Sequence, residues 1–81
     1  MKQILANPSQ LGQILRSARR ARKLTQSEAA SRIGVSQSRL SAMELDASSV
    51  TATQLLALMA LYGLELVLRD KSAAPATQVE W

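Results

Sequence analysis

Residues 24–45 read LTQSEAASRIGVSQSRLSAMEL, a stretch that predicts two short helices joined by a tight turn. Thr25 and Glu28 match a capping box, in which each side chain bonds the backbone N–H of the other residue, so a helix begins after Thr25. Gly34 lies where the end of this helix requires a residue with positive φ. Ser36 is a suitable cap for the next helix. The turn between the two helices is therefore only a few residues long.

These two helices match the helix-turn-helix motif, whose second helix lies in the major groove of DNA. Ala30 is small at the point where the helices must cross, and Gly34 makes the turn. The second helix is predicted from Gln37 to about Glu44. The apolar residues that would bury it are Val35, Leu40 and Met43. A generic helical hairpin is the alternative. Such a hairpin does not require a small residue at position 30, a turn residue at position 34 and apolar residues at positions 35, 40 and 43.

Further helices are predicted on both sides of this motif. Asn7 and Pro8 begin a helix that extends to about Arg22, because Asn is a good cap and Pro is tolerated at the first helical position. Its apolar stripe consists of Leu11, Ile14, Leu15 and Ala18. Another helix is predicted from Thr51 to about Tyr62, after a loop. This helix is apolar on most sides, so we expect a second subunit to cover it.

Residues 64–68 read LELVL, and the alternation of Leu64, Leu66 and Leu68 is typical of a β-strand. A lone strand cannot satisfy its own backbone groups, so we expect it to pair with the same strand of a second chain. A helix that continues through Gly63 is the alternative. The candidate residues of the dimer interface are Leu58, Met59, Leu66 and Leu68.

Residues 71–81 are rich in Ala, Ser, Thr and Gln and show no period. We therefore expect a disordered tail after a single DNA-binding and dimerisation domain formed by residues 1–70. The tail ends in Trp81, the one tryptophan of the chain. Because Trp is favoured at binding hot spots, Trp81 is either an anchor for a partner's pocket or incidental.

The composition argues against an enzyme. The 81 residues include no Cys and no His, which removes disulfides, Cys or His metal sites and His-based catalytic triads. The six acidic residues show no paired arrangement, and no Gly-rich phosphate loop is present, so we expect no cofactor, metal or small-molecule substrate. No apolar run approaches the about 18 residues of a membrane span, and no signal peptide is evident. We expect a cytoplasmic protein that does not bind membranes.

The charges are segregated along the chain. Residues 1–43 carry eight basic residues and one acidic residue, a balance of +7. Residues 44–81 carry two basic and five acidic residues, a balance of −3. A basic N-terminal half indicates a face that binds a polyanion, and a solvated helix face is the alternative.

Four runs of sequence resemble the Xre/Cro-type helix-turn-helix family of phage repressors and their bacterial relatives. They are LRSAR (15–19), LTQSEAA (24–30), IGVSQS (33–38) and LSAME (40–44). The resemblance covers roughly residues 9–63. Within that family, the strand after the last helix, the Ser/Ala/Pro/Thr tail and the closing Glu80-Trp81 are similar to HipB-type antitoxins. The expected fold is thus all-α: a compact, phage-repressor-like bundle of four to five helices, with a short C-terminal β-strand pairing across a homodimer.

The resemblance implies a homodimer that binds a palindromic operator in its own promoter and represses transcription. It also implies the antitoxin of a type II toxin–antitoxin pair, which holds a HipA-type Ser/Thr protein kinase toxin inactive, with Trp81 as a candidate toxin contact. Such a protein would be associated with the nucleoid when bound to DNA. A stand-alone repressor without a toxin is the alternative. A third hypothesis is an interaction module that has lost DNA binding, which the acidic Asp46 favours.

The DNA contacts follow from helix geometry and from the resemblance. Side chains at the start of a recognition helix reach the bases, and helix N-termini hold phosphates. The candidate base contacts are Ser27, Gln37, Ser38 and Arg39. The candidate phosphate contacts are Arg16, Arg20, Lys23, Gln26, Arg32, Ser36 and Ser41. The resemblance further implies a buried ion pair between Arg19 and Glu44, and Lys23 departs from it by standing where many relatives have Gly.

Overall fold

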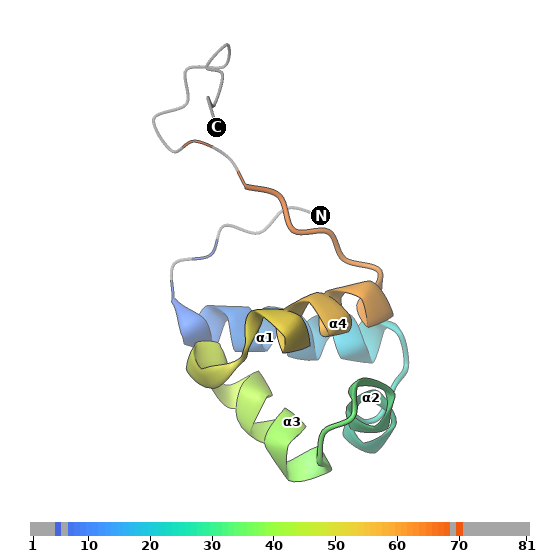
Figure 1. Ribbon diagram of the computed structural model, residues 1–81. Coiled ribbons are helices and arrows are strands. Elements are labelled where there is room, and N and C mark those ends of the chain that lie inside the picture. The colour runs from blue at the N-terminus through green and yellow to red at the C-terminus, as the bar shows by residue number, and fades with distance from the viewer. Residues whose placement is uncertain (1–4, 6, 69, 71–81) are drawn as a thin grey trace.

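The computed structural model describes residues 5, 7–68 and 70, which form helices and connecting turns (Figure 1). The elements are α1 (Pro8–Ala21), α2 (Gln26–Ile33), α3 (Gln37–Leu45), the 3₁₀ turn η1 (Ala47–Ser49) and α4 (Ala52–Tyr62). In Figure 1, α1 and α4 lie along the upper side of the bundle, and α2 and α3 lie below them. The four predicted helices are confirmed, and the predicted loop after α3 contains the short turn η1.

The helices begin at the caps that the sequence predicts. Asn7 Oδ1 accepts a hydrogen bond from Gln10 N at 2.9 Å, directly ahead of Pro8. Thr25 and Glu28 form the reciprocal capping box at the start of α2. The remaining N-caps are Ser36 for α3 and Thr51 for α4. Local hydrogen bonding by short polar side chains thus sets where each helix starts.

Left-handed backbone lies after three of the helices. Gly34 has φ 76° after α2, and Gly63 has φ 71° after α4, so α4 does not continue as a helix into residues 64–68. Lys23, where the resemblance implies Gly, has φ 58° after α1. The turn therefore keeps the left-handed conformation, although a side chain costs about 1–2 kcal/mol there.

An aliphatic core lies between the helices. It consists of Leu15, Ala29, Ala30, Leu40, Met43, Leu58 and Tyr62. The predicted inward positions of Leu40 and Met43 are confirmed, since neither side chain is exposed. The turn residue Val35 is partly buried against this core. The motif is therefore held by a single shared core.

Two of the proposed interface residues lie in that core region instead. Leu58 is fully buried, Met59 is buried, and α4 contacts both α1 and α2 of the same chain. Within the single chain Leu58 and Met59 therefore expose little surface to a second subunit, and their contact across a dimer stays a prediction. On α4, Leu56 keeps 55% of its surface exposed.

The segment after α4 leads away from the bundle (Figure 1). Residues 64–68 have no regular secondary structure in the single chain, and Leu66, Val67 and Leu68 are exposed. Their pairing as a strand would require a second chain, so it stays a prediction. The predicted tail, 71–81, lies outside the described residues. Among the helices of the described residues, none is long and apolar enough to cross a membrane.

Candidate nucleic-acid interface

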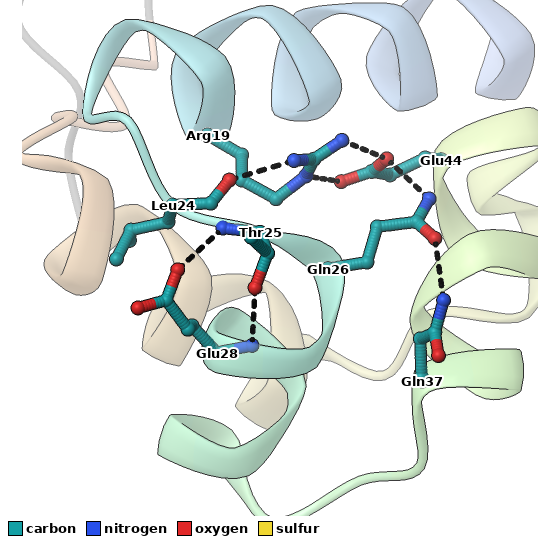
Figure 2. A network of polar contacts seen from close by, with 7 residues as sticks. All are labelled: Arg19, Leu24, Thr25, Gln26, Glu28, Gln37 and Glu44. Atoms are coloured by element: carbon teal, nitrogen blue, oxygen red, sulfur yellow. Dashed lines mark hydrogen bonds and ion pairs between the residues drawn. The ribbon is translucent and has the colours of Figure 1, made fainter.

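A buried ion pair joins α1 to α3. Arg19 Nε donates to Glu44 Oε2 at 2.7 Å, and Arg19 Nη2 donates to Glu44 Oε1 at 3.2 Å (Figure 2). Both residues are buried, at 8% and 4% exposed. The hydrogen bond to Glu44 raises the pKa of the Arg19 guanidinium above its usual value. The pair that the resemblance implies is thus present, in the two-pronged geometry that guanidinium and carboxylate favour.

The same guanidinium also reaches the connection between α1 and α2. Arg19 Nη1 donates to the Leu24 carbonyl at 2.7 Å, directly before the cap of α2 (Figure 2). At that cap, Thr25 N donates to Glu28 Oε1 at 2.8 Å. The bond from the Thr25 backbone, with that of its hydroxyl, lowers the pKa of the Glu28 carboxyl. One buried arginine therefore positions the first turn of α2 relative to both α1 and α3.

Polar side chains continue from the ion pair to the start of α3. Gln26 Nε2 donates to Glu44 Oε1 at 3.1 Å, and Gln37 Nε2 donates to Gln26 Oε1 at 3.3 Å (Figure 2). Ser27 Oγ donates to Gln37 Oε1 at 3.4 Å. We call these residues, Arg19, Gln26, Ser27, Gln37 and Glu44, the Glu44 network. The structure thereby brings together three of the residues that the sequence proposes for DNA contact.

A close approach of two backbones sets the spacing of α1 and α3. A Cβ at Gly12 would lie 2.6 Å from the carbonyl oxygen of Glu44 and 3.0 Å from that of Met43. Gly12 is therefore required for the packing that buries the ion pair. Gly12 is not among the residues proposed from the sequence, although a glycine inside a helical pattern is a signal of close packing.

Several of the proposed phosphate contacts line one open hollow beside the ion pair. The hollow has a volume of about 440 Å³ and is lined by Arg16, Arg19, Arg20, Gln26, Ser41, Glu44 and Leu45. Arg16 and Arg20 are exposed, one turn apart on α1. With the N-terminus of α2 beside them, these cations form a suitable setting for a phosphate group.

The other proposed contacts lie elsewhere on the surface. Ser38 is exposed in the first turn of α3, and Arg32 is exposed in the last turn of α2. Ser36 Oγ caps α3 by accepting a hydrogen bond from Arg39 N at 3.0 Å. Lys23 occupies the turn between α1 and α2. None of these four residues lines the hollow.

Arg39 is engaged within the chain. Its Nη1 donates to Ser49 Oγ at 2.9 Å, and its Nη2 donates to the Ser49 carbonyl at 2.8 Å and to Gln54 Oε1 at 3.2 Å. Gln54 is also the second member of the capping box of α4. In this conformation Arg39 braces the connection from α3 to α4. The structure does not bring it into the Glu44 network, so the prediction of a base contact by Arg39 gains no support.

Asp46 has a local structural task. Its Oδ1 accepts a hydrogen bond from Ser48 N at 2.9 Å, which caps η1. Asp46 was the residue that favoured an interaction module without DNA binding. Its role as the cap of η1 explains an acidic residue at this position without that hypothesis.

A second contact joins the ends of α1 and α4. Arg22 Nε donates to the Tyr62 carbonyl at 2.9 Å, and its Nη2 fills the space that a Cβ at Gly63 would require. Tyr62 is 2% exposed, and within the described residues its hydroxyl has no hydrogen-bond partner. Burial raises the pKa of Tyr62 to about 12, with Glu44 adding to the shift and Arg19 opposing it. No local sequence pattern indicates this contact, since it joins residues 40 positions apart.

The described part of the chain offers no cluster of three or more acidic side chains that could hold a metal ion. Its polar groups donate and accept hydrogen bonds, and its exposed cations attract anions. This chemistry suits recognition of a polyanion.

Comparisons with known proteins agree with this geometry. A family model described as a helix-turn-helix domain matches residues 10–71. A chain in the structure of a HipA-HipB-O2-O3 complex shares 28% identity, aligns over 86% of this chain and 99% of its own length, and has a TM-score of 0.75. A HipB-O4 20mer complex gives the same values. A HipB-O2 20mer complex gives 27% identity, 88% and 99% coverage, and a TM-score of 0.76. No curated protein matches the sequence.

Proposed function

This chain belongs to the helix-turn-helix domain family, and from that premise we propose that it is a sequence-specific DNA-binding repressor of its own promoter. The observation that carries the proposal is the Glu44 network, which connects a buried ion pair to Gln37 at the start of α3. The charge balance of +7 over residues 1–43 supports it, because that half contains α1, α2 and most of α3. The solved HipB-O4 20mer and HipB-O2 20mer complexes, to which the chain is similar, support it further.

In this proposal, α3 enters the major groove and α2 lies across its edge. Gln37 and Ser38, with Ser27 beside them, contact base edges. The N-termini of α2 and α3 contact phosphates, together with Arg16, Arg20, Lys23, Gln26, Arg32, Ser36 and Ser41. Arg39 would contact a base only after leaving Ser49 and Gln54.

We also propose a homodimer, which gives two recognition helices for a palindromic operator. Its interface would use the exposed apolar groups of residues 64–68, above all Leu66 and Leu68, paired as a two-stranded sheet. Exposed Leu56 on α4 is available to the same interface. The sequence also proposes Leu58 and Met59 for this interface, and both are buried in the single chain.

As a non-enzymatic cytoplasmic regulator, the protein would act as the antitoxin of a HipA-type kinase toxin. Support comes from the similarity to a chain in a HipA-HipB-O2-O3 complex. The proposed partner contact at Trp81 rests on the sequence. A stand-alone repressor of the same fold is the second candidate, since the same DNA-binding surface serves both.

The test uses a labelled duplex from upstream of the protein's own gene, in a gel shift across a series of salt concentrations. We expect a dimer to bind with an affinity that falls steeply with salt, because phosphate contacts release counterions. Binding that does not depend on salt, or is equal for an unrelated duplex, would refute a specific repressor. Co-purification of a kinase encoded beside the gene separates the antitoxin from the stand-alone repressor.

A further inference from the structure

In the Glu44 network, each hydrogen bond has a fixed donor and a fixed acceptor. Glu44 Oε1 accepts from Arg19 Nη2 at 3.2 Å and from Gln26 Nε2 at 3.1 Å (Figure 2). A carboxylate paired with a guanidinium accepts hydrogen bonds and donates none. The amide nitrogen of Gln26 therefore has to face Glu44, and the amide oxygen of Gln26 has to face away from it.

The orientation of the Gln26 amide in turn sets the orientation of the Gln37 amide. The outward oxygen of Gln26 requires a donor, and Gln37 Nε2 supplies it at 3.3 Å. Gln37 Oε1 then accepts from the hydroxyl of Ser27 at 3.4 Å. Both bonds are longer than the usual distance of about 2.9 Å. A flipped Gln37, however, would set its own oxygen against that of Gln26, so repulsion as well as attraction fixes the orientation.

The geometry points to Glu44 as a positioning residue for base recognition, a role that rests on the proposed DNA-binding function. After its two bonds, the Gln37 amide retains one N–H and one oxygen lone pair for a ligand. A donor beside an acceptor matches the major-groove edge of adenine, whereas guanine offers two acceptors. If the Gln37 amide could flip freely, its N–H and its oxygen could exchange places in front of the base. Because the network fixes the amide, the N–H and the oxygen each have one position, and these positions match adenine on one strand only.

The variant Gln26→Met tests this role, since it interrupts the network and leaves both bonds between Arg19 and Glu44 in place. Gln13→Met is the matched control, because it makes the same chemical change at an exposed position of α1. Each protein selects from a pool of duplexes randomised over about 20 base pairs, the length of two neighbouring half-sites. All selections use one salt concentration.

We expect the wild-type protein and Gln13→Met to select the same sequences, with adenine at one position of each half-site. Gln26→Met should lower the adenine preference at that position by about threefold or more, the effect of one lost hydrogen bond. Preferences at the other positions should not change. Uniform weakening by Gln26→Met, with all preferences kept, would show that Gln26 contacts only phosphate and would overturn the role of Glu44. An unchanged selection would overturn it as well.

Glu44→Gln is the second variant. A carboxamide at this position can donate as well as accept, so it permits Gln26 to flip, and the same single preference should weaken. Circular dichroism shows whether this variant folds; if it does not, Gln26→Met alone decides. Should the wild-type protein enrich no sequence at all, the proposed function itself falls, an outcome distinct from the loss or retention of one base preference.

Discussion

Gly12 of α1 packs directly on the backbone carbonyl of Glu44 in α3, at a distance that leaves no room for a Cβ. Because the obstacle is backbone rather than a flexible side chain, Gly12→Ala has to push the two helices apart. Alanine is more favourable than glycine inside a helix by about 1 kcal/mol. Overpacking, however, costs about 1–3 kcal/mol and also disturbs the ion pair. We expect a net loss of about 1–2 kcal/mol in the free energy of unfolding, measured with urea.

Gly34→Ala is a useful comparison, since no atom lies within 4 Å of a Cβ at that position. Its effect should be limited to the strain of positive φ, about 1 kcal/mol. Stabilisation by Gly12→Ala would show that α1 and α3 are not in this close contact.

Removal of one partner of the buried ion pair should be strongly destabilising. Glu44→Ala leaves the Arg19 guanidinium buried without its carboxylate, which costs about 3–5 kcal/mol. The double variant Arg19→Met with Glu44→Leu leaves no buried charge and should be less destabilised than Glu44→Ala. Thermal and urea unfolding of the three proteins measure this. A Glu44→Ala protein as stable as the wild type would mean that the pair is exposed in solution.

Lys23→Gly should stabilise the protein. Lys23 has φ 58°, where glycine has no steric penalty, so we expect a gain of about 1 kcal/mol in the free energy of unfolding. The control is Ala21→Gly at the exposed end of α1, which should lose up to about 1 kcal/mol through lower helix propensity. The two substitutions should therefore change the free energy of unfolding in opposite directions, although they are only two residues apart. A loss of stability for Lys23→Gly would contradict the left-handed conformation of this turn.

Tyr62 makes the stability depend on pH in the alkaline range. A tyrosine has a pKa of about 10 in an unfolded chain, whereas burial raises that of Tyr62 to about 12. Between these values the unfolded state loses the proton first, so the free energy of unfolding falls as the pH rises from about 10 to about 12. Below about pH 10 the phenol is protonated in both states and contributes no slope.

Because Tyr62 is the one tyrosine, absorbance of its phenolate reports the titration without overlap from another tyrosine. Tyr62→Phe should remove this part of the alkaline loss. It should also be neutral or stabilising at pH 7, because it deletes a buried hydroxyl that has no partner among the described residues. A midpoint near 10 in the folded protein would contradict the burial of the ring.

Gln37→Ala tests direct recognition of a base. We expect a loss of about 1–3 kcal/mol in binding to the protein's own operator, with binding to unrelated DNA nearly unchanged. The matched measurement is Arg20→Gln, which should weaken both duplexes and reduce the salt slope by about one for each subunit of the dimer. Equal losses on the two duplexes for Gln37→Ala would assign that residue to the phosphate backbone instead.

The sequence predicts those parts of the fold that depend on neighbouring residues. The caps at Asn7, Thr25 and Ser36, and the left-handed Gly34, require only short-range chemistry, and all are confirmed. The ion pair of Arg19 with Glu44 could be anticipated from the resemblance to a family, since nothing local relates residues 25 positions apart.

What could not be predicted depends on how the helices pack. From the sequence, α4 has more apolar residues than one face can bury, so Leu58 could lie either in the core or at the surface. In the structure α4 contacts α1 and α2, and Leu58 is buried. Gly12 gains its importance from a backbone on another helix. Arg39 lies on the expected face of α3, but its partners belong to the connection that follows, so its rotamer was not accessible from the pattern.

The contact between Arg22 and the end of α4 also has a consequence for evolution. The guanidinium fills the space beside Gly63 and satisfies the Tyr62 carbonyl at the end of α4. A side chain at position 63 would displace the guanidinium from the Tyr62 carbonyl, and it would itself have to tolerate positive φ. Among homologues that keep this hydrogen bond, position 63 should therefore stay Gly wherever position 22 is Arg, although the two positions lie 41 residues apart in the sequence.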